Sequence, residues 1–252
     1  MIRPSRISPD VLINESLGTA DLAASPMCAN GMKLLIYARD NEGITLTKSS
    51  GFFRKFVTWA AHEFRWPEHE PEKLFAVNKV LNEQDFFPLA VMHSLMLATR
   101  LIRHYKGKAV LTKAGRAMIG DYGRLQAVLF DAYFSTLDLS EYERFPMEYE
   151  DADLRHCLGV VQNRLDDWVV LADLAGWCLP LDMIRASPVD PVRDACFHLI
   201  SRLIRPLIWM GLLERKPEQD RTRIEQRHYR KTTLFDRFIR TAFWQDGGWS
   251  IH

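Results

Sequence analysis

The segment that decides the fold is Asp85–Ile119, with the sequence DFFPLAVMHSLMLATRLIRHYKGKAVLTKAGRAMI. Its first part is apolar and predicts a helix over 85–100. Two short strands are predicted next, on either side of Lys106-Gly107, a pair typical of a tight hairpin turn. Thr112 then predicts the N-cap of a further helix over 113–119, because its hydroxyl can accept from a free N–H of the first turn.

A second segment repeats this order later in the chain. A helix predicted over 192–210 is followed by the short strand Gly211–Glu214, a polar excursion and a second strand that ends before Thr232. Pro206 lies inside that helix and predicts a kink or the start of a new helix, because its ring clashes with the preceding turn. Helix, strand, wing, strand and capped helix form the layout of a winged helix-turn-helix. The sequence therefore predicts a mainly α fold with small β wings, made of two such units.

Short motifs in these segments resemble those of known proteins. They are Ile44–Gly51 (ITLTKSSG), Leu111–Gly115 (LTKAG) and Gly211–Glu214 (GLLE). In these features the chain resembles uncharacterised bacterial proteins with tandem winged-helix-like units, well over about residues 30–120 and moderately over about 190–242. The resemblance implies the fold and implies no catalytic residues.

Details of the motifs set further expectations. Thr99-Arg100 stands where the resembled group usually has a glycine, and Leu234-Phe235 stands where a glycine would follow Thr232. Thr47 predicts the N-cap of a helix over 48–62. Gly51 and Gly115, the small residues that follow the capping threonines within four positions, predict close packing of the first helical turn.

Charge is distributed unevenly along the chain. The formal net charge of +1 combines +5 over residues 1–130, −8 over 131–175, +6 over 191–240 and −2 over the remaining residues. The near-neutral total therefore does not exclude a basic surface that binds a polyanion.

We expect four parts in the chain. They are an N-terminal extension with a helix (1–43), the first winged-helix-like unit (44–120), an acidic helical connector (121–165), and the second unit with an aromatic tail (166–252).

Composition and motifs exclude several classes of protein. Hydrophobic residues make up 47% and charged residues 26% of the chain, so it is expected to fold. No signal peptide or membrane-spanning segment is predicted, and four cysteines without a CxxC pair indicate a reduced, cytoplasmic protein. No metal-binding motif, nucleophile motif or glycine-rich phosphate loop is present. We therefore expect no metal, no cofactor and no enzyme activity, although an enzyme of unrecognised type stays open as a third hypothesis.

The first hypothesis is binding of duplex DNA through the second unit. A winged helix reads DNA with the helix before the wing, and its wing contacts phosphates. In the first unit that helix has no cation before Arg100, and the cations of its wing are few. The second unit offers a larger set of candidate contacts: His198, Arg202, Arg205, Arg215, Lys216, Arg221, Arg223 and Arg227. Acidic residues are interleaved with them, so an ion-paired, solvated surface is the competing interpretation.

The second hypothesis is a protein-interaction or oligomerisation module, with a protein partner or a homodimer. The apolar helix over 85–100 supports it, and Phe86 and Met92 are its candidate contacts. Trp244 and Trp249, near the C-terminus of the sequence, are further candidates, because apolar rings on a terminal segment favour docking.

Overall fold

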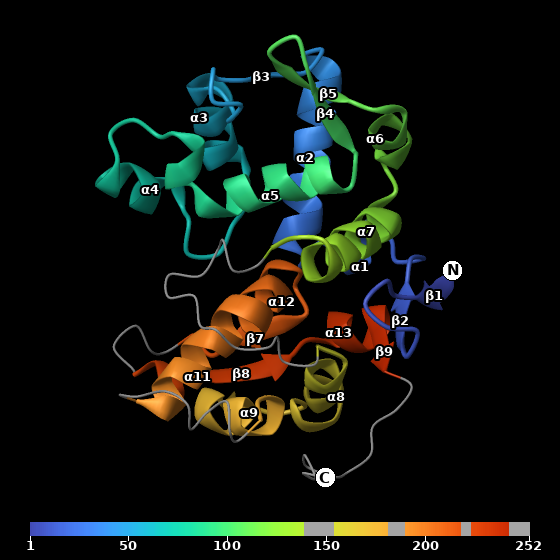
Figure 1. The fold of residues 1–252 in the computed structure, drawn as a ribbon, viewed down its shortest axis with the longest axis vertical. Helices are drawn as coiled ribbons and strands as arrows, with labels where there is room; N and C mark the ends of the chain where they lie inside the picture. The colour runs from blue at the N-terminus through green and yellow to red at the C-terminus, as the bar shows by residue number, and fades with distance from the viewer. Residues whose placement is uncertain (139–153, 181–189, 218–222, 242–252) are drawn as a thin grey trace. The chain divides into compact units, whose positions relative to one another are not determined.

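The computed structural model describes residues 1–138, 154–180, 190–217 and 223–241 of the chain. The chain forms two compact units. We call Glu15–Leu137 the continuous unit, and Met1–Asn14 with Asp138–His252 the split unit. Helices dominate both units and small antiparallel sheets accompany them, which confirms a mainly α chain with small β elements (Figure 1). The four-part division made from the sequence stays a prediction.

The continuous unit is a helical body with one small sheet. Its elements are α1 (Thr19–Leu22), α2 (Pro26–Asp40), β3 (Ile44–Thr45), α3 (Arg54–Glu63), α4 (Pro71–Val77), the 3-10 helix η1 (Glu83–Asp85), α5 (Phe87–Ala98), β4 (Ile102–Tyr105), β5 (Lys108–Leu111), α6 (Lys113–Met118) and α7 (Tyr122–Ser135).

Helices α2, α5 and α7 form the core of the continuous unit. Ser25 caps α2 by accepting from the N–H of Cys28, and its hydroxyl also lies 2.8 Å from the side-chain oxygen of Gln126 on α7. Gly31 lies where α2 meets Met92 of α5 and Leu129 of α7. A glycine here allows the three helices to approach closely, so the core is continuous across them.

The sheet of the continuous unit has the strand order β3-β5-β4, with antiparallel neighbours. Strands β4 and β5 form a hairpin that turns at Lys106-Gly107, as predicted, and both turn residues have positive φ angles. In Figure 1 this hairpin leads from the end of α5 into α6.

The split unit joins an N-terminal β-hairpin to a second helical body. Its described elements are β1 (Ile2–Pro4), β2 (Val11–Asn14), α8 (Leu154–Arg164), β6 (Val169–Val170), α9 (Leu171–Cys178), α11 (Pro191–Leu199), the π-helix η3 (Ile200–Ile204), α12 (Arg205–Trp209), β7 (Leu213–Arg215), the 3-10 helix η4 (Ile224–Gln226), β8 (His228–Lys231), α13 (Thr233–Phe238) and β9 (Ile239–Thr241).

Two sheets organise the described part of the split unit. One has the strand order β1-β2-β9 and the other β6-β8-β7. The second sheet repeats the order of the continuous unit, in which the last strand of the hairpin lies between the other two. The prediction for Pro206 is confirmed, because α11 passes through a π-turn and α12 begins at Arg205.

The same hydrogen bonds close the turn between helix and hairpin in both units. Arg100 and Gly211 follow their helices with φ angles of +55° and +72°. The Thr112 hydroxyl donates to the carbonyl of Arg100 at 2.7 Å, and the Thr232 hydroxyl donates to the carbonyl of Gly211 at 2.6 Å. The two threonines thus tie the end of each hairpin to the end of the helix that precedes it.

Of the two helix caps predicted from the threonines of the first unit, one is confirmed and the other is wrong. The Thr112 hydroxyl accepts from the N–H of Gly115 and caps α6. Thr47 does not cap a helix over 48–62, because α3 begins only at Arg54. Its hydroxyl instead accepts from the N–H of Gly51 and closes a turn. This local hydrogen bond takes the place of the bond that the hydroxyl would make as a helix cap.

Candidate functional site

The candidate DNA contacts on the helical segment of the split unit point less to solvent than predicted. His198 is 4% exposed and lies in the core, while Arg202 and Arg205 are half-buried. The exposed side chains of α11 are instead Val192, Arg193 and Phe197, with the Arg193 guanidinium 5.5 Å from the Phe197 ring centre. A buried side chain cannot reach a DNA groove, so the structure removes His198 from the candidate contacts.

Cations of the β7–β8 region are balanced by acidic neighbours. Arg230 Nε lies 2.6 Å from Glu214 Oε1 across the strand pair. Lys231 Nζ lies 2.9 Å from carboxylates of both Asp166 and Asp236. Burial alone would lower the pKa of Lys231, but its hydrogen bonds to the two carboxylates raise that pKa overall. Ion pairs whose carboxylates are exposed, as these are, add little to stability, but they offset the positive charges of Arg230 and Lys231.

The remaining candidates of this region differ in exposure. Arg223 is exposed, whereas Arg215, Lys216 and Arg227 are half-buried. Arg202, Arg205, Arg215 and Lys216 also interact within the chain. Arg221 lies outside the described residues.

The candidate protein contacts of the continuous unit are buried. Phe86 and Met92 are both 0% exposed, because the helix that carries Met92 faces the core formed with α2 and α7. Side chains that are fully buried in the unit cannot contact a partner, so Phe86 and Met92 are removed from the candidate protein contacts. Trp244 and Trp249 lie outside the described residues.

A basic surface lies on the β4–β5 hairpin of the continuous unit. We call Arg103, Tyr105, Lys106 and Lys108 the hairpin surface. Tyr105 is 49% exposed, and the Arg103 guanidinium and the Lys106 ammonium lie 5.0 and 5.3 Å from its ring centre. Tyr105 pairs with Lys108 across the hairpin, and side chains of paired residues lie on the same face of a strand pair. Two cations therefore lie over one exposed aromatic ring, and a third, Lys108, lies on the same face of the hairpin.

No acidic residue offsets this charge nearby in the sequence. Residues 86–120 contain no Asp or Glu, while the hairpin cations are accompanied by Arg100, Lys113 and Arg116. All three of these are exposed. Within the described part of the chain, no ion pair involves any of these six cations. The hairpin surface thus differs from the β7–β8 region, where the neighbouring charges cancel.

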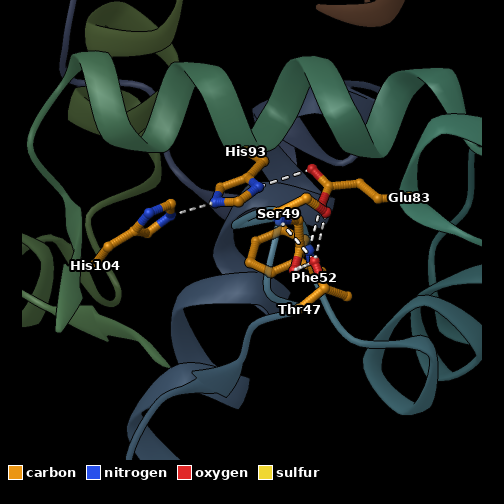
Figure 2. Close-up of polar contacts among 7 residues, drawn as sticks. Thr47, Ser49, Phe52, Glu83, His93 and His104 are labelled. Atoms are coloured by element: carbon orange, nitrogen blue, oxygen red, sulfur yellow. Dashed lines mark hydrogen bonds and ion pairs between the residues drawn. The ribbon is translucent and has the colours of Figure 1, made fainter. Parts of the chain in front are cut away.

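A cluster of ionisable side chains lies on the other face of strand β4. We call Glu83, His93 and His104 the histidine cluster (Figure 2). His93 Nδ1 lies 2.7 Å from Glu83 Oε1, and His93 Nε2 lies 3.0 Å from His104 Nε2. The side chains of His93 and Glu83 are 7% and 11% exposed, whereas His104 is exposed. The cluster therefore forms a hydrogen-bonded chain from the solvent to a buried carboxylate.

Neighbouring groups fix the buried end of the histidine cluster. The other oxygen of Glu83 accepts from the backbone N–H of Phe52, and the Phe52 ring stacks on His93 with ring centres 3.9 Å apart. Figure 2 shows this arrangement, with Thr47 and Ser49 beside the Phe52 backbone. Burial, and then the neighbouring His93, lower the pKa of His104 below 6.5. The surroundings of His104 therefore favour the neutral form of its ring.

Sequence reasoning missed the histidine cluster. Its members belong to η1, α5 and β4 and fit no local spacing rule for metal or catalytic sites. Among the described residues, no group of three or more His, Cys, Asp or Glu side chains is placed to hold a metal ion.

None of the described helices combines the length and apolarity needed to cross a membrane.

Comparison with known proteins relates part of the continuous unit to a bacterial family. Residues 23–124 match the family described as the Y4jL N-terminal domain. The chain is 43% identical over 101 residues to the uncharacterized protein y4jL of Sinorhizobium fredii (strain NBRC 101917 / NGR234). This similarity covers 40% of the chain and 46% of that protein, so the chain spans less than half the length of the relative. No solved structure matches the chain. Both the hairpin surface and the histidine cluster lie within residues 23–124.

Proposed function

We propose that the chain binds duplex DNA through two winged-helix-like units, and that the hairpin surface makes the main contacts to phosphates. The observation that carries the proposal is the pair of cations over the exposed Tyr105 ring, with Lys108 opposite on the same face of the hairpin, in a stretch without acidic residues. Uncompensated Lys and Arg side chains bind DNA by displacing the counterions of its phosphates. The proposed role is non-enzymatic and needs no cofactor.

The repeated topology supports the winged-helix assignment. In both units a helix is followed by a short strand, further helices and a hairpin, and the last hairpin strand lies in the middle of the sheet. The matching bonds from Thr112 and Thr232 to the preceding turns place the two hairpins at equivalent points of their units, although only Thr112 also caps the helix that follows. In this assignment α5 and the α11–α12 segment correspond to the recognition helices, and the hairpins correspond to the wings.

The proposed contact is made by the wing of the continuous unit and not by its helix. The positions of α5 that are not fully buried are occupied by uncharged residues: Phe87, Ala90, Ser94, Leu97 and Ala98. Contacts to phosphates position a protein on DNA but carry no sequence information. We therefore expect the continuous unit to bind duplexes of different sequence with similar affinity.

In this proposal, the split unit has a supporting role. Its exposed Arg223 is the candidate with the most direct access to a phosphate. Arg202, Arg205, Arg215, Lys216 and Arg227 are half-buried, and the nearby strand cations are ion-paired. Their contribution to affinity is expected to be smaller than that of the hairpin surface.

The proposal is tested by fluorescence anisotropy with a labelled duplex of random sequence. We expect the full chain to bind at low salt and to lose affinity steeply between about 50 and 200 mM salt. The double variant Arg103→Ala with Lys106→Ala should lower the affinity about tenfold and lower the salt slope by about 2, one for each lost phosphate contact.

A matched control removes the same charge elsewhere on the same unit. Lys55 and Lys79 are exposed and lie outside the hairpin, so the variant Lys55→Ala with Lys79→Ala should bind nearly as the unchanged chain does. Equal losses in both double variants would show a diffuse charge effect and would contradict a site on the hairpin. No binding at low salt would remove the DNA proposal.

A protein-binding role is the second proposal. The apolar side chains Phe53, Val77 and Val80 of the continuous unit are 49%, 82% and 52% exposed, and they replace Phe86 and Met92 as candidate contacts. If this role is correct, the chain should self-associate in light scattering, and Val77→Asp should shift it to the monomer. A monomer at all concentrations would count against self-association.

A further inference from the structure

We propose that His93 and His104 bind a divalent transition-metal ion of borderline softness, with Zn²⁺ as the best match, through their facing Nε2 atoms. The inference is independent of DNA binding. It rests on the convergence of two imidazole nitrogens, on the carboxylate behind one of them and on the open path to solvent at the other.

The distance between the two nitrogens is close to that of a bound ion. Zn–N bonds are about 2.0–2.1 Å long, and two ligands of a tetrahedral ion are then about 3.3 Å apart. His93 Nε2 and His104 Nε2 are 3.0 Å apart. The ion cannot lie on the line of the hydrogen bond, so the exposed His104 ring has to turn and move its Nε2 sideways by about 2 Å, while His93 stays in place and the distance between the two nitrogens changes little.

Glu83 lies where an outer-shell partner of a metal ligand is needed. Histidines that bind metals almost always donate their second ring N–H to a carboxylate, a carbonyl or water, which fixes the ring and its tautomer. His93 Nδ1 lies 2.7 Å from Glu83 Oε1, and the Phe52 backbone N–H holds the other Glu83 oxygen. With its Nδ1 proton directed to Glu83, a neutral His93 presents the lone pair of Nε2 to His104.

The proton balance of the site allows an ion to replace the hydrogen bond. Without an ion, one proton must lie between the two Nε2 atoms, and His104 Nε2–H is its donor when His93 is neutral. When an ion binds, that proton leaves Nε2 and the exposed Nδ1 of His104 takes up a proton from water. The ring stays neutral, and no net proton is released.

Strand geometry separates the site from the cations of the hairpin surface. Successive side chains of a strand point to opposite faces, so His104 faces away from Arg103 and Tyr105. Two protein ligands leave two positions of a tetrahedral ion to water, one more than in open sites with three protein ligands, so we expect binding weaker than at such sites. Burial raises the pKa values of the Cys28 and Cys196 thiols to about 12, so these thiols stay protonated and compete poorly for the ion.

The test is titration of the full, metal-free chain with Zn²⁺ by calorimetry. We expect one saturable site, and two-dimensional NMR of the histidine rings should show that the Nε2 signals of His93 and His104 both shift at saturation. His104→Gln should weaken binding at least tenfold and leave the circular dichroism spectrum unchanged, because the side chain is exposed. Glu83→Gln should weaken binding about tenfold, the lower end of outer-shell effects.

The control is His62→Gln, which removes a histidine of the same unit that stacks on Phe75 and lies outside the cluster. Its Zn²⁺ affinity should equal that of the unchanged chain. The proposal is overturned if no saturable binding is found, if His104→Gln binds as tightly as the unchanged chain, or if His62→Gln loses as much affinity as His104→Gln.

Discussion

Arg100 occupies a backbone position that suits glycine. Its φ angle of +55° is in the left-handed region, where a side chain costs about 1–2 kcal/mol, and Gly211 takes the equivalent place in the split unit. We predict that Arg100→Gly raises the free energy of unfolding by about 1 kcal/mol, because relief of strain exceeds the extra entropy of a glycine in the unfolded chain. The midpoint of urea unfolding measures the change. Arg100→Ala removes the same charge but keeps the strain and should give no gain; an equal gain would assign the effect to charge.

The buried thiols are expected to resist modification at alkaline pH. Burial raises the pKa values of Cys28 and Cys196 from 9.0 to about 12, and it also raises the pKa of Cys178. At pH 9 an unfolded thiol is half ionised, whereas a folded thiol with a pKa near 12 is ionised in about one molecule in a thousand. The folded state thus keeps its protons, and its stability should fall as the pH rises from 9 towards 12.

Labelling with a thiol-reactive disulfide reagent at pH 9 measures this protection. Cys28 and Cys196 should react slowly in the native chain and rapidly in urea, with reacted residues identified by mass spectrometry. Rapid labelling of Cys28 without urea would show that α2 opens locally or that the thiol is not buried.

At the scale of elements, the sequence predicts the helices, turns and caps that depend on local patterns. The apolar run of α5, the Lys106-Gly107 turn and the Thr112 cap each depend on residues close together in the chain. The histidine cluster was missed because Glu83, His93 and His104 meet only when η1, α5 and β4 pack together. The sequence predicts His198 as a DNA contact although it is buried, because spacing shows which residues share a face but not which face is covered.

The helix α6 packs against the start of the hairpin through a glycine. A Cβ atom at Gly115 would lie 2.0 Å from the carbonyl oxygen of Leu101, which is backbone and cannot move aside easily. We predict that Gly115→Ala destabilises the continuous unit by about 3 kcal/mol, measured by urea unfolding. The matched control is Gly176→Ala, which lies in α9 with no atom close to the new Cβ and should gain up to about 1 kcal/mol from helix propensity. A neutral Gly115→Ala would mean that α6 can shift away from Leu101.

At the scale of the whole molecule, the first residues of the chain belong to the unit that its last part forms. Strand β2 pairs with β9, so that Ile13 lies opposite Ile239 and Val11 opposite Thr241. Val11 and Ile13 are both 0% exposed, and burial of an aliphatic side chain contributes about 1.5–3 kcal/mol. The stability of the split unit therefore depends on a segment that is separated from the rest of that unit by the whole continuous unit.

Removal of residues 1–14 should consequently destabilise the split unit by about 4 kcal/mol, the contribution of two buried aliphatic side chains, and leave the continuous unit unchanged. Hydrogen exchange followed by mass spectrometry checks this directly. Amides of α8 and β8 should lose protection, because α8 packs against β9 and the core beneath it opens, while amides of α2 and α5 should keep theirs. Removal of residues 1–8 deletes β1 but keeps β2 and should have a much smaller effect. Loss of protection in α2 and α5 together with α8 would show that the two units unfold as one cooperative body and would contradict their independence.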